Sequence, residues 1–300
     1  MINPEDAFRI DVPHLFSFGE SLSFLNRNVR ECLHKVDRDR VLKLLPAGGN
    51  YYLAEISADP AGLVLRFPQA MPPEQHMKEL RSYLKELFDL DADLEGFYRQ
   101  VGKDRILGEL VCNYAGLRLI GMPDLFEALC WAIIGQQINL SFAYTLKRNL
   151  VQATGYSLEY AGEKYYAFPE PAAVRACSPE MLLAMQFSRR KVEYIMEIAR
   201  QFEEEGLSKE SLLALGSREA IVQRLISIRG VGMWTAEYVL MKCLKYYDAF
   251  PIADIGLQNA LKQMLGSAEK PGPDEIRKLA AGWKGWESYA TFYLWRSLIV

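Results

Sequence analysis

Residues 225–265 read LISIRGVGMWTAEYVLMKCLKYYDAFPIADIGLQNALKQML, and this stretch decides the fold. It predicts an apolar helix end, a turn around Gly230 and Gly232, a second helix, and a third helix opened by Asp254. Glycine accepts positive φ and leaves backbone N–H groups uncovered. Those groups stand at the start of the second helix, near Met233, where the helix dipole favours an anion. The stretch therefore predicts a helix-hairpin-helix with a phosphate-binding turn, although an ordinary tight turn is the commoner explanation of two such glycines alone.

The helix after the turn carries an aromatic face. Trp234, Tyr238 and Met241 are spaced i, i+4 and i+7, so they share one side. Aromatic residues at this spacing are more often core than ligand site, but here the opposite side already supplies a core, with Ala236, Val239, Leu240 and Cys243. Asp254 follows one loop later, where it is an ordinary N-cap that contributes ~1 kcal/mol. A cap and a functional carboxylate are compatible, so the pattern indicates a site between the aromatic face and Asp254.

Four sequence blocks carry a family resemblance. They are IRGVGMWTAEYVLM at 228–241, IADIGLQNAL at 252–261, AIIGQQINLSFAY at 132–144 and WKGWESYATFYLW at 283–295. In this order they resemble the helix-hairpin-helix DNA glycosylase superfamily, and within it the AlkA type of 3-methyladenine DNA glycosylase II. The resemblance implies a base excision repair enzyme that acts on double-stranded DNA with alkylated bases.

The resemblance also implies the fold class, α+β. A small antiparallel α/β domain is expected over residues 1–110, followed by an all-helical glycosylase domain over 111–300. Two helical subdomains would flank a central cleft, with the helix-hairpin-helix at 221–246. The residues agree in the first part, because VLKLL, YYLAEI and GLVLRF are strand-like runs separated by Gly- and Pro-containing turns, which predicts an antiparallel meander.

Residues 123–155 predict two consecutive helices. Pro123 and Asp124 open an apolar helix, Ser141 is expected to cap the next, and Gly155 helps to end it. The polar Gln137 between them is either a loop amide or, by the resemblance, the wedge that fills the gap left by a flipped base.

The remaining site roles follow from the resemblance and from the chemistry of base excision. A base inside a duplex must be flipped out, which costs a few kcal/mol. Alkylated purines are cationic, and a desolvated cation over an indole gains ~2 kcal/mol or more. An ionised carboxylate stabilises the positive charge that develops on the sugar. The resemblance therefore implies Asp254 as the catalytic residue and an aromatic base pocket of Trp234, Tyr238 and Trp295.

One departure within the superfamily bears on the reaction. Members that also cut the strand carry a lysine just after the hairpin, and this position is Trp234 here. Without an amine for a Schiff base, we expect a monofunctional glycosylase that releases 3-methyladenine and 7-methylguanine and leaves an abasic site. An adenine or oxidised-base glycosylase/lyase is a weaker alternative, and a non-catalytic helix-hairpin-helix DNA-binding protein is the alternative from another class.

Phosphate contacts and ions are expected at three places. The hairpin offers the backbone of Gly230, Gly232 and Met233. A basic start to a later helix offers Arg189, Arg190 and Lys191, for which a solvated helix start is an equal explanation. The carbonyls of Ile226, Ile228 and Val231 match positions that hold Na⁺ or K⁺ in relatives. No cofactor is expected to be required, and the five scattered cysteines lack the cluster that would hold an iron–sulfur centre.

The composition limits the partners. A formal net charge of −3 argues against a DNA partner, so we expect modest affinity with a shallow salt dependence. No apolar run approaches the ~20 residues of a membrane span, and the N-terminus lacks a signal-peptide pattern. We expect a cytoplasmic monomer without membrane contact, associated with the nucleoid when bound to DNA.

Overall fold

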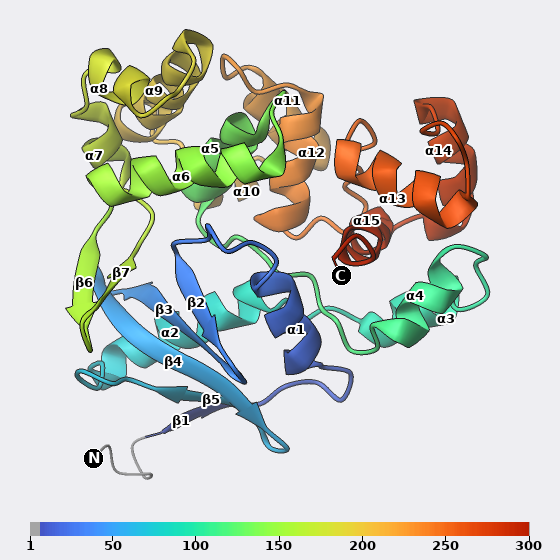
Figure 1. Cartoon of the computed structure of the whole chain (residues 1–300), viewed down its shortest axis with the longest axis horizontal. Coiled ribbons are helices and arrows are strands. Elements are labelled where there is room, and N and C mark those ends of the chain that lie inside the picture. The colour runs from blue at the N-terminus through green and yellow to red at the C-terminus, as the bar shows by residue number, and fades with distance from the viewer. Residues whose placement is uncertain (1–6, 300) are drawn as a thin grey trace.

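The computed structural model describes residues 7–299. Its N-terminal part forms one antiparallel sheet of five strands in the order β1-β5-β4-β3-β2 (Figure 1). The strands are β1 (Phe8–Ile10), β2 (His34–Asp37), β3 (Arg40–Ala47), β4 (Asn50–Asp59) and β5 (Gly62–Arg66). The expected meander is confirmed as β3, β4 and β5. The edge strands β1 and β2 have three and four residues, too few to show an alternating pattern.

Two helices accompany this sheet. Helix α1 (Phe18–Leu25) is capped by Ser17, whose hydroxyl accepts a hydrogen bond from the Glu20 N–H. Helix α2 (Glu74–Leu87) packs on β3 and buries Leu80 and Leu84 against it. The sheet and these helices form the lower part of the molecule in Figure 1.

The rest of the described chain is mainly helical. Its helices are α3 (Leu94–Val101), α4 (Leu107–Asn113), α5 (Leu125–Gly135), α6 (Leu140–Thr154), α7 (Pro171–Arg175), α8 (Pro179–Ala184), α9 (Arg189–Glu204), α10 (Lys209–Leu213), α11 (Arg218–Ile226), α12 (Met233–Lys242), α13 (Ile255–Leu265), α14 (Pro273–Leu279), the 3₁₀ helix η2 (Ala280–Trp283) and α15 (Glu287–Arg296).

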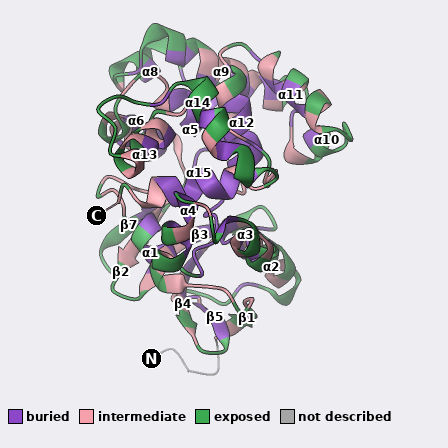
Figure 2. Cartoon of the chain, turned by 90° about the vertical axis from the view of Figure 1, so that its right-hand side faces the viewer, coloured by how far each residue is buried: buried purple, intermediate pink, exposed green. Residues whose placement is uncertain are grey.

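These helices form two lobes (Figure 1). In the first, the almost wholly apolar α5 packs against α6, α9 and α12, as a helix that is apolar all round must. In the second, α13 packs on α15, and α15 packs on α4. Figure 2 shows buried residues concentrated in α5, α12 and α15.

The chain enters the second lobe before residue 110. Helix α3 packs on η2, and the Tyr98 hydroxyl lies 2.7 Å from the Tyr293 hydroxyl of α15. The boundary expected at residue 110 also falls inside α4. Two helices that precede α5 in sequence therefore support the C-terminal lobe.

The expectation of an all-helical region after residue 111 needs one correction. Strands β6 (Ser157–Tyr160) and β7 (Glu163–Tyr166) form an antiparallel hairpin after α6. β7 packs on β3 of the N-terminal sheet, where Tyr165 shares a small apolar cluster with Leu42 and Leu44. A hairpin is stable here because the sheet below covers its apolar side chains.

The caps differ from the expectation at one helix. Asp124 caps α5 as expected, and its carboxylate accepts a hydrogen bond from the Glu127 N–H at 2.7 Å. Asn139, not Ser141, caps α6: its side chain accepts from the Phe142 N–H at 2.8 Å. Asn139 has the extended backbone of a cap, whereas Ser141 is already in the first turn. Within residues 7–299, no helix combines the length and hydropathy needed to cross a membrane.

Candidate active site

Asp254 is the N-cap of α13 and faces two other helices. Its Oδ1 accepts a hydrogen bond from the Leu257 N–H at 2.8 Å, as a cap does. The same oxygen accepts from Trp295 Nε1 of α15 at 2.8 Å, and Oδ2 accepts from Trp234 Nε1 of α12 at 3.3 Å. One carboxylate thus receives donors from its own helix and from two others, α12 and α15.

Burial and hydrogen bonding act on this carboxylate in opposite directions. Desolvation raises the pKa of Asp254, while the Leu257 N–H and the indole N–H groups of Trp295 and Trp234 lower it. Desolvation is the largest influence, so the net pKa lies above the ordinary value of an aspartate. A half-buried carboxylate with fixed donors can stabilise a neighbouring positive charge with little reorganisation.

The aromatic residues expected to form one face meet around Asp254. The ring centroids of Trp234 and Tyr238 lie 5.7 Å apart, and those of Tyr238 and Trp295 lie 6.1 Å apart. The planes are tilted by 33° and 35°, so the rings line a common wall rather than stack on one another. Tyr238 is buried, whereas Trp234 and Trp295 are half-buried.

Gly256 allows this approach. A Cβ at this position would lie 2.9 Å from the Asp254 carboxylate and 3.1 Å from the Trp295 ring. Any residue other than glycine at position 256 would therefore push the Trp295 indole away from Asp254.

The helix-hairpin-helix consists of α11, the turn and α12, so it spans 218–242 where 221–246 was expected. Gly230 has φ +92°, and a Cβ there would lie 2.3 Å from the Tyr194 ring. Gly232 is the N-cap of α12, has extended backbone, and a Cβ there would meet nothing within 4 Å. Among residues 7–299 no side chain caps α12, so its first N–H groups point out beside the exposed Met233.

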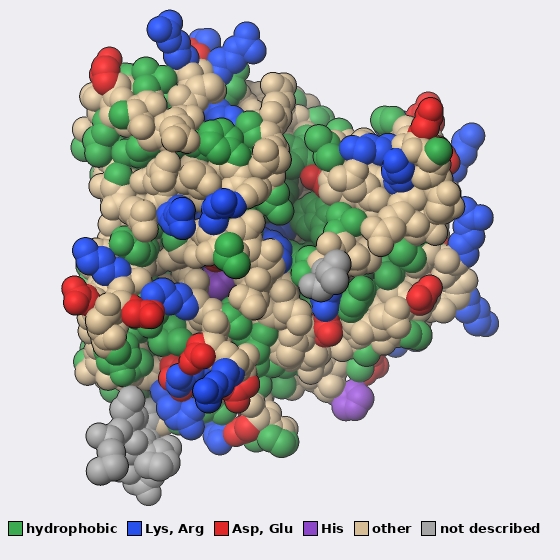
Figure 3. Space-filling model, in the orientation of Figure 1, with side chains coloured by type: hydrophobic (Ala, Val, Ile, Leu, Met, Phe, Trp, Pro, Cys, Tyr) green, Lys and Arg blue, Asp and Glu red, His purple; other side chains and the backbone are tan. Residues whose placement is uncertain are grey.

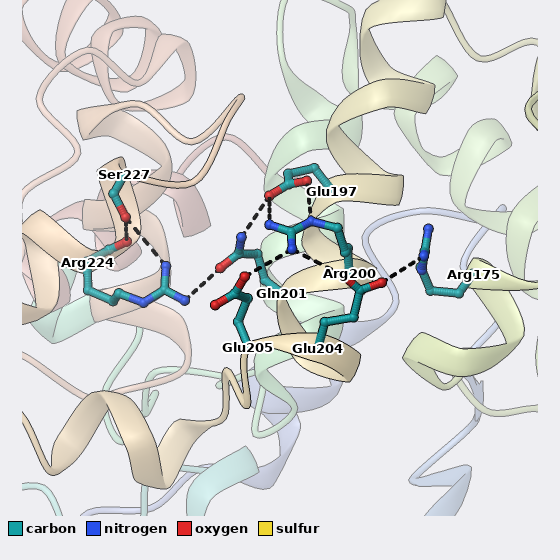
Figure 4. A network of polar contacts seen from close by, with 8 residues as sticks. All are labelled: Arg175, Glu197, Arg200, Gln201, Glu204, Glu205, Arg224 and Ser227. Carbon is teal, nitrogen blue, oxygen red and sulfur yellow. Dashed lines mark hydrogen bonds and ion pairs between the residues drawn. The ribbon is translucent and has the colours of Figure 1, made fainter.

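A polar network joins α11 to α9 and so positions the hairpin (Figure 4). Arg224 donates to the Gln201 side-chain oxygen at 2.6 Å, and Gln201 donates to Glu197 at 2.7 Å. Arg200 donates to both oxygens of Glu197 at 2.9 Å. The bidentate Arg200–Glu197 pair lies within α9, and the Arg224–Gln201 bond joins this charge-assisted network to α11, the helix that precedes the hairpin turn.

The loop between α5 and α6 lies against the hairpin. Gln136 Nε2 donates to the Gly230 carbonyl at 3.1 Å and to the Thr235 hydroxyl at 3.2 Å. The next residue, Gln137, is exposed and has φ +56°, a left-handed conformation that is uncommon for a residue with a side chain. The loop therefore projects Gln137 outward while Gln136 ties it to the turn.

A cleft opens beside these residues. Figure 3 shows the face hollowed between the lobe of α5, α6 and α12 and the lobe of α13–α15, with mainly apolar side chains in the hollow. A partly open cavity of about 60 Å³ lies nearby, but of the site residues only Tyr238 lines it. It has room for one or two waters, so the open cleft is the candidate site.

Comparison with known proteins places this arrangement in a family. The family described as HhH-GPD superfamily base excision DNA repair protein matches residues 130–285, which include the second half of α5, the hairpin, α12 and Asp254. The N-terminal domain of 8-oxoguanine DNA glycosylase matches residues 4–129.

The chain belongs to the HhH-GPD superfamily.

Individual relatives agree with this assignment. A DNA-3-methyladenine glycosylase of Bacillus subtilis (strain 168) is 40% identical over 98% of this chain and 97% of its own length. The fold is that of a 3-methyladenine DNA-glycosylase from Archaeoglobus fulgidus, with TM-score 0.79, 24% identity, and 96% and 97% of the two chains covered. It is also that of a Clostridium acetobutylicum 8-oxoguanine glycosylase/lyase, with TM-score 0.73, 19% identity, and 97% and 98% covered. The resemblance found in the sequence is confirmed.

The basic start of α9 in this HhH-GPD chain needs a correction. Arg189 and Arg190 are exposed, but Lys191 is buried and its ammonium donates to the Ile134 carbonyl at 2.5 Å. Burial lowers the pKa of Lys191 to about 8. Lys191 therefore ties α9 to α5, and its side chain is not available as the phosphate contact expected with Arg189 and Arg190.

The carbonyls expected to hold a monovalent ion lie at the end of α11 and in the turn. The Ile228 carbonyl already accepts a hydrogen bond from the Val231 N–H at 3.0 Å. A carbonyl oxygen has two lone pairs, so an ion at Ile226, Ile228 and Val231 stays a prediction. Within residues 7–299, no group of three or more His, Cys, Asp or Glu side chains is arranged to hold a metal ion.

Two site residues were not predicted from the sequence. Gln136 was seen only as part of a polar loop, although an amide directly after a buried apolar helix requires a partner. Gly256 was seen only as a neighbour of the N-cap, although a glycine inside the first turn of a helix weakens it and signals a close approach.

Proposed function

We propose that this protein is a monofunctional DNA glycosylase that hydrolyses the N-glycosidic bond of alkylated, cationic purines such as 3-methyladenine and 7-methylguanine. Its substrate is double-stranded DNA, and the product is an abasic site. The observation that carries the proposal is the Asp254 carboxylate, held by two indole N–H groups at the edge of an aromatic cleft.

The chemistry follows from these groups. A flipped base enters the cleft and contacts the rings of Trp234, Tyr238 and Trp295, which attract a cationic purine through their π faces. The bond between the base nitrogen and C1′ breaks, and the base leaves with the electron pair. The ionised Asp254 stabilises the positive charge on the sugar and accepts a proton from the water that attacks C1′. A cationic base is a good leaving group and needs no separate acid.

The absence of a strand-cleaving step rests on Trp234. Its indole has no amine for a Schiff base, and on the same face of α12 Lys242 lies two turns further on. Lys242 is buried, and its ammonium donates to the Ile120 carbonyl. The Clostridium protein is a glycosylase/lyase by name, but at 19% identity its likeness to this chain supports a shared fold and not a shared reaction.

The other expected properties belong to this proposal. Backbone N–H groups at Gly232 and Met233, with Arg189 and Arg190, bind the phosphates, and Gln137 fills the gap left by the flipped base. The enzyme acts as a monomer in the cytoplasm, on the nucleoid. It requires no cofactor and has no iron–sulfur cluster, while Na⁺ or K⁺ binds at the hairpin carbonyls.

The test is incubation with methylated duplex DNA. We expect free 3-methyladenine and 7-methylguanine in the supernatant, and strand breaks only after alkali treatment. The matched variant Asp254→Asn keeps the helix cap and DNA binding but loses at least ~100-fold in release rate, the scale expected for losing a group that stabilises transition-state charge.

Two outcomes would contradict the proposal. Binding without any base release identifies a non-catalytic DNA-binding protein. Strand breaks without alkali identify a glycosylase/lyase, and trapping with borohydride would then locate the amine.

A further inference from the structure

The most exposed apolar side chains gather around the candidate site. Among large hydrophobic residues of the described chain, the four with the highest exposed fractions are Val29 (95%), Ile255 (58%), Met233 (55%) and Leu140 (54%). Ile255 follows Asp254, Met233 precedes Trp234, and Leu140 begins α6 directly after the Gln137 loop. Exposed apolar groups in one region indicate a contact surface. Val29 is the unexpected member, because it comes from the N-terminal region.

Three contacts fix the loop of residues 26–31, between α1 and β2, on α6. Arg30 donates to the Ser141 hydroxyl, and the Arg27 guanidinium lies 5.8 Å from the centre of the Tyr144 ring. The Glu31 and Lys147 side chains form an ion pair at 2.6 Å. Their partners on α6 are spaced i, i+3 and i+6, so the loop follows one face of that helix.

These contacts place the loop beside the wedge. Ser141 lies in the first turn of α6, four residues after Gln137 and next to Leu140. Gln136 in turn binds the hairpin carbonyl of Gly230. A continuous set of contacts therefore leads from the hairpin through the Gln137 loop to residues 26–31, and Figure 1 shows the latter rising from α1 toward α6.

The loop is held in one shape. The Asn28 side chain accepts from the Arg30 N–H at 2.9 Å, and one Glu31 oxygen accepts from the Cys32 and Leu33 N–H groups at 2.8 and 2.9 Å. Glu31 is neutralised by buried Lys147. The Arg27 guanidinium lies 4.1 Å from the centre of the Phe24 ring and donates to the Phe24 carbonyl at 2.9 Å, so the cation next to Val29 at the surface is that of half-buried Arg30. A rigid loop thus presents one bare apolar side chain next to one cationic residue.

We propose that residues 26–31 form a second DNA-contacting loop, in which Val29 packs against the bases next to the flipped nucleotide. This inference rests on the proposed DNA binding. Proteins that bend duplex DNA insert apolar side chains between base steps, and arginines beside them contact the phosphates. The charge of the loop suits DNA rather than an apolar protein surface.

The test measures binding, not chemistry. The probe is a duplex with one tetrahydrofuran abasic analogue, which the enzyme cannot cleave, and an intact duplex of the same sequence is the reference. Because Val29 is exposed in the free protein, Val29→Ser leaves the melting temperature unchanged. We expect it to weaken binding to the abasic-analogue duplex about tenfold, the scale for leaving one valine side chain unburied.

Two variants complete the design. Val29→Ile retains an apolar tip and keeps wild-type affinity. Met71→Ser alters another exposed apolar residue of the N-terminal region, 50% exposed, and leaves the affinity unchanged. Unchanged binding by Val29→Ser, or an equal loss with Met71→Ser, overturns the inference.

The outcomes separate the inference from the proposed function. If the wild type binds the analogue duplex but releases no methylated base, the glycosylase chemistry fails while a selective Val29→Ser loss still supports the loop. If a protein partner captures the wild type but not Val29→Ser and the duplex affinities are equal, the loop serves a protein interface, and our assignment to DNA is overturned.

Discussion

Two indole N–H groups share one carboxylate at the centre of the site, and their hydrogen bonds differ in length. Trp295 donates at 2.8 Å and Trp234 at 3.3 Å. Both bonds stabilise the ionised form of Asp254 against the desolvation that raises its pKa. The indoles therefore have an electrostatic role in addition to the stacking surface that their rings provide.

This difference predicts a shift in the pH profile. Trp295→Phe keeps an aromatic ring but removes the shorter bond, so the pKa of Asp254 rises further. Since the ionised carboxylate is the active form, base release is lost on acidification, and in Trp295→Phe it is lost at a higher pH than in wild type. Rates of 7-methylguanine release from pH 4 to 8 measure this shift.

Trp234→Phe is the matched comparison. The hydrogen bond that Trp234 donates to Asp254 is longer than that of Trp295, so the pH at which Trp234→Phe loses activity on acidification shifts less. Acidic limbs that coincide in all three proteins would show that the indole N–H groups do not act on the carboxylate.

At the scale of an element, α12 differs from its neighbours in how it begins. Helices α5, α6, α9, α11 and α13 each have a side chain that caps the first turn, whereas among the described residues none caps α12. The two hairpin glycines also have different roles. Gly230 is required by its positive φ and by the Tyr194 ring, while Gly232 faces open space.

Gly232→Val is therefore the clean probe of the hairpin. It adds a side chain over the first N–H groups of α12 without a clash, so the protein stays folded. We expect a loss of affinity of the same factor for intact and lesion-containing duplexes, because backbone contacts carry no sequence information. Fluorescence anisotropy with both duplexes measures the two factors, and a loss confined to the lesion duplex would rule out a phosphate role.

Gly230→Ala serves as the contrasting variant. It strains the turn at φ +92° and pushes on Tyr194, so we expect it to lower the melting temperature as well as the affinity.

At the scale of the whole molecule, the N-terminal region is joined to the helical part by polar contacts as well as apolar ones. The Glu31–Lys147 pair lies between them, with 10% and 4% of the side chains exposed. Burial alone would raise the pKa of Glu31, but the Lys147 ammonium, His34 and the Leu33 N–H together outweigh it, and the net pKa lies below the ordinary value. The Lys147 ammonium also lies 4.9 Å from the Trp131 ring centre.

We expect Lys147→Met to reduce the free energy of unfolding by about 3–5 kcal/mol, because it leaves the Glu31 carboxylate buried without its cationic partner. The double variant with Glu31→Gln recovers most of that loss. Urea denaturation at neutral pH measures both.

The same pair predicts a pH dependence. A carboxyl with a lowered pKa stabilises the fold above its ordinary pKa and loses that contribution as the pH falls through the lowered value. Wild type should therefore lose more stability on acidification than the double variant. Equal acid sensitivity would mean that the pair does not contribute.

The sequence by itself determined the elements whose cause is local. Glycines 230 and 232 indicated the turn, Asp124 and Asp254 the helix starts, and strand-like runs separated by Gly- and Pro-containing turns the strands β3 to β5. Capping and turn formation depend on residues within a few positions, so they can be read from the chain. Family resemblance added the functional positions, and the comparisons confirm the family.

Only the tertiary structure decided which distant groups meet. It directs Lys191 to the Ile134 carbonyl instead of the surface, adds the β6–β7 hairpin, and brings Trp295 to Asp254 across 41 positions. It also brings Arg30 of the N-terminal region to Ser141 in the first turn of α6. The physical reason is that buried donors take whichever acceptor the packing presents, and packing depends on all the helices at once.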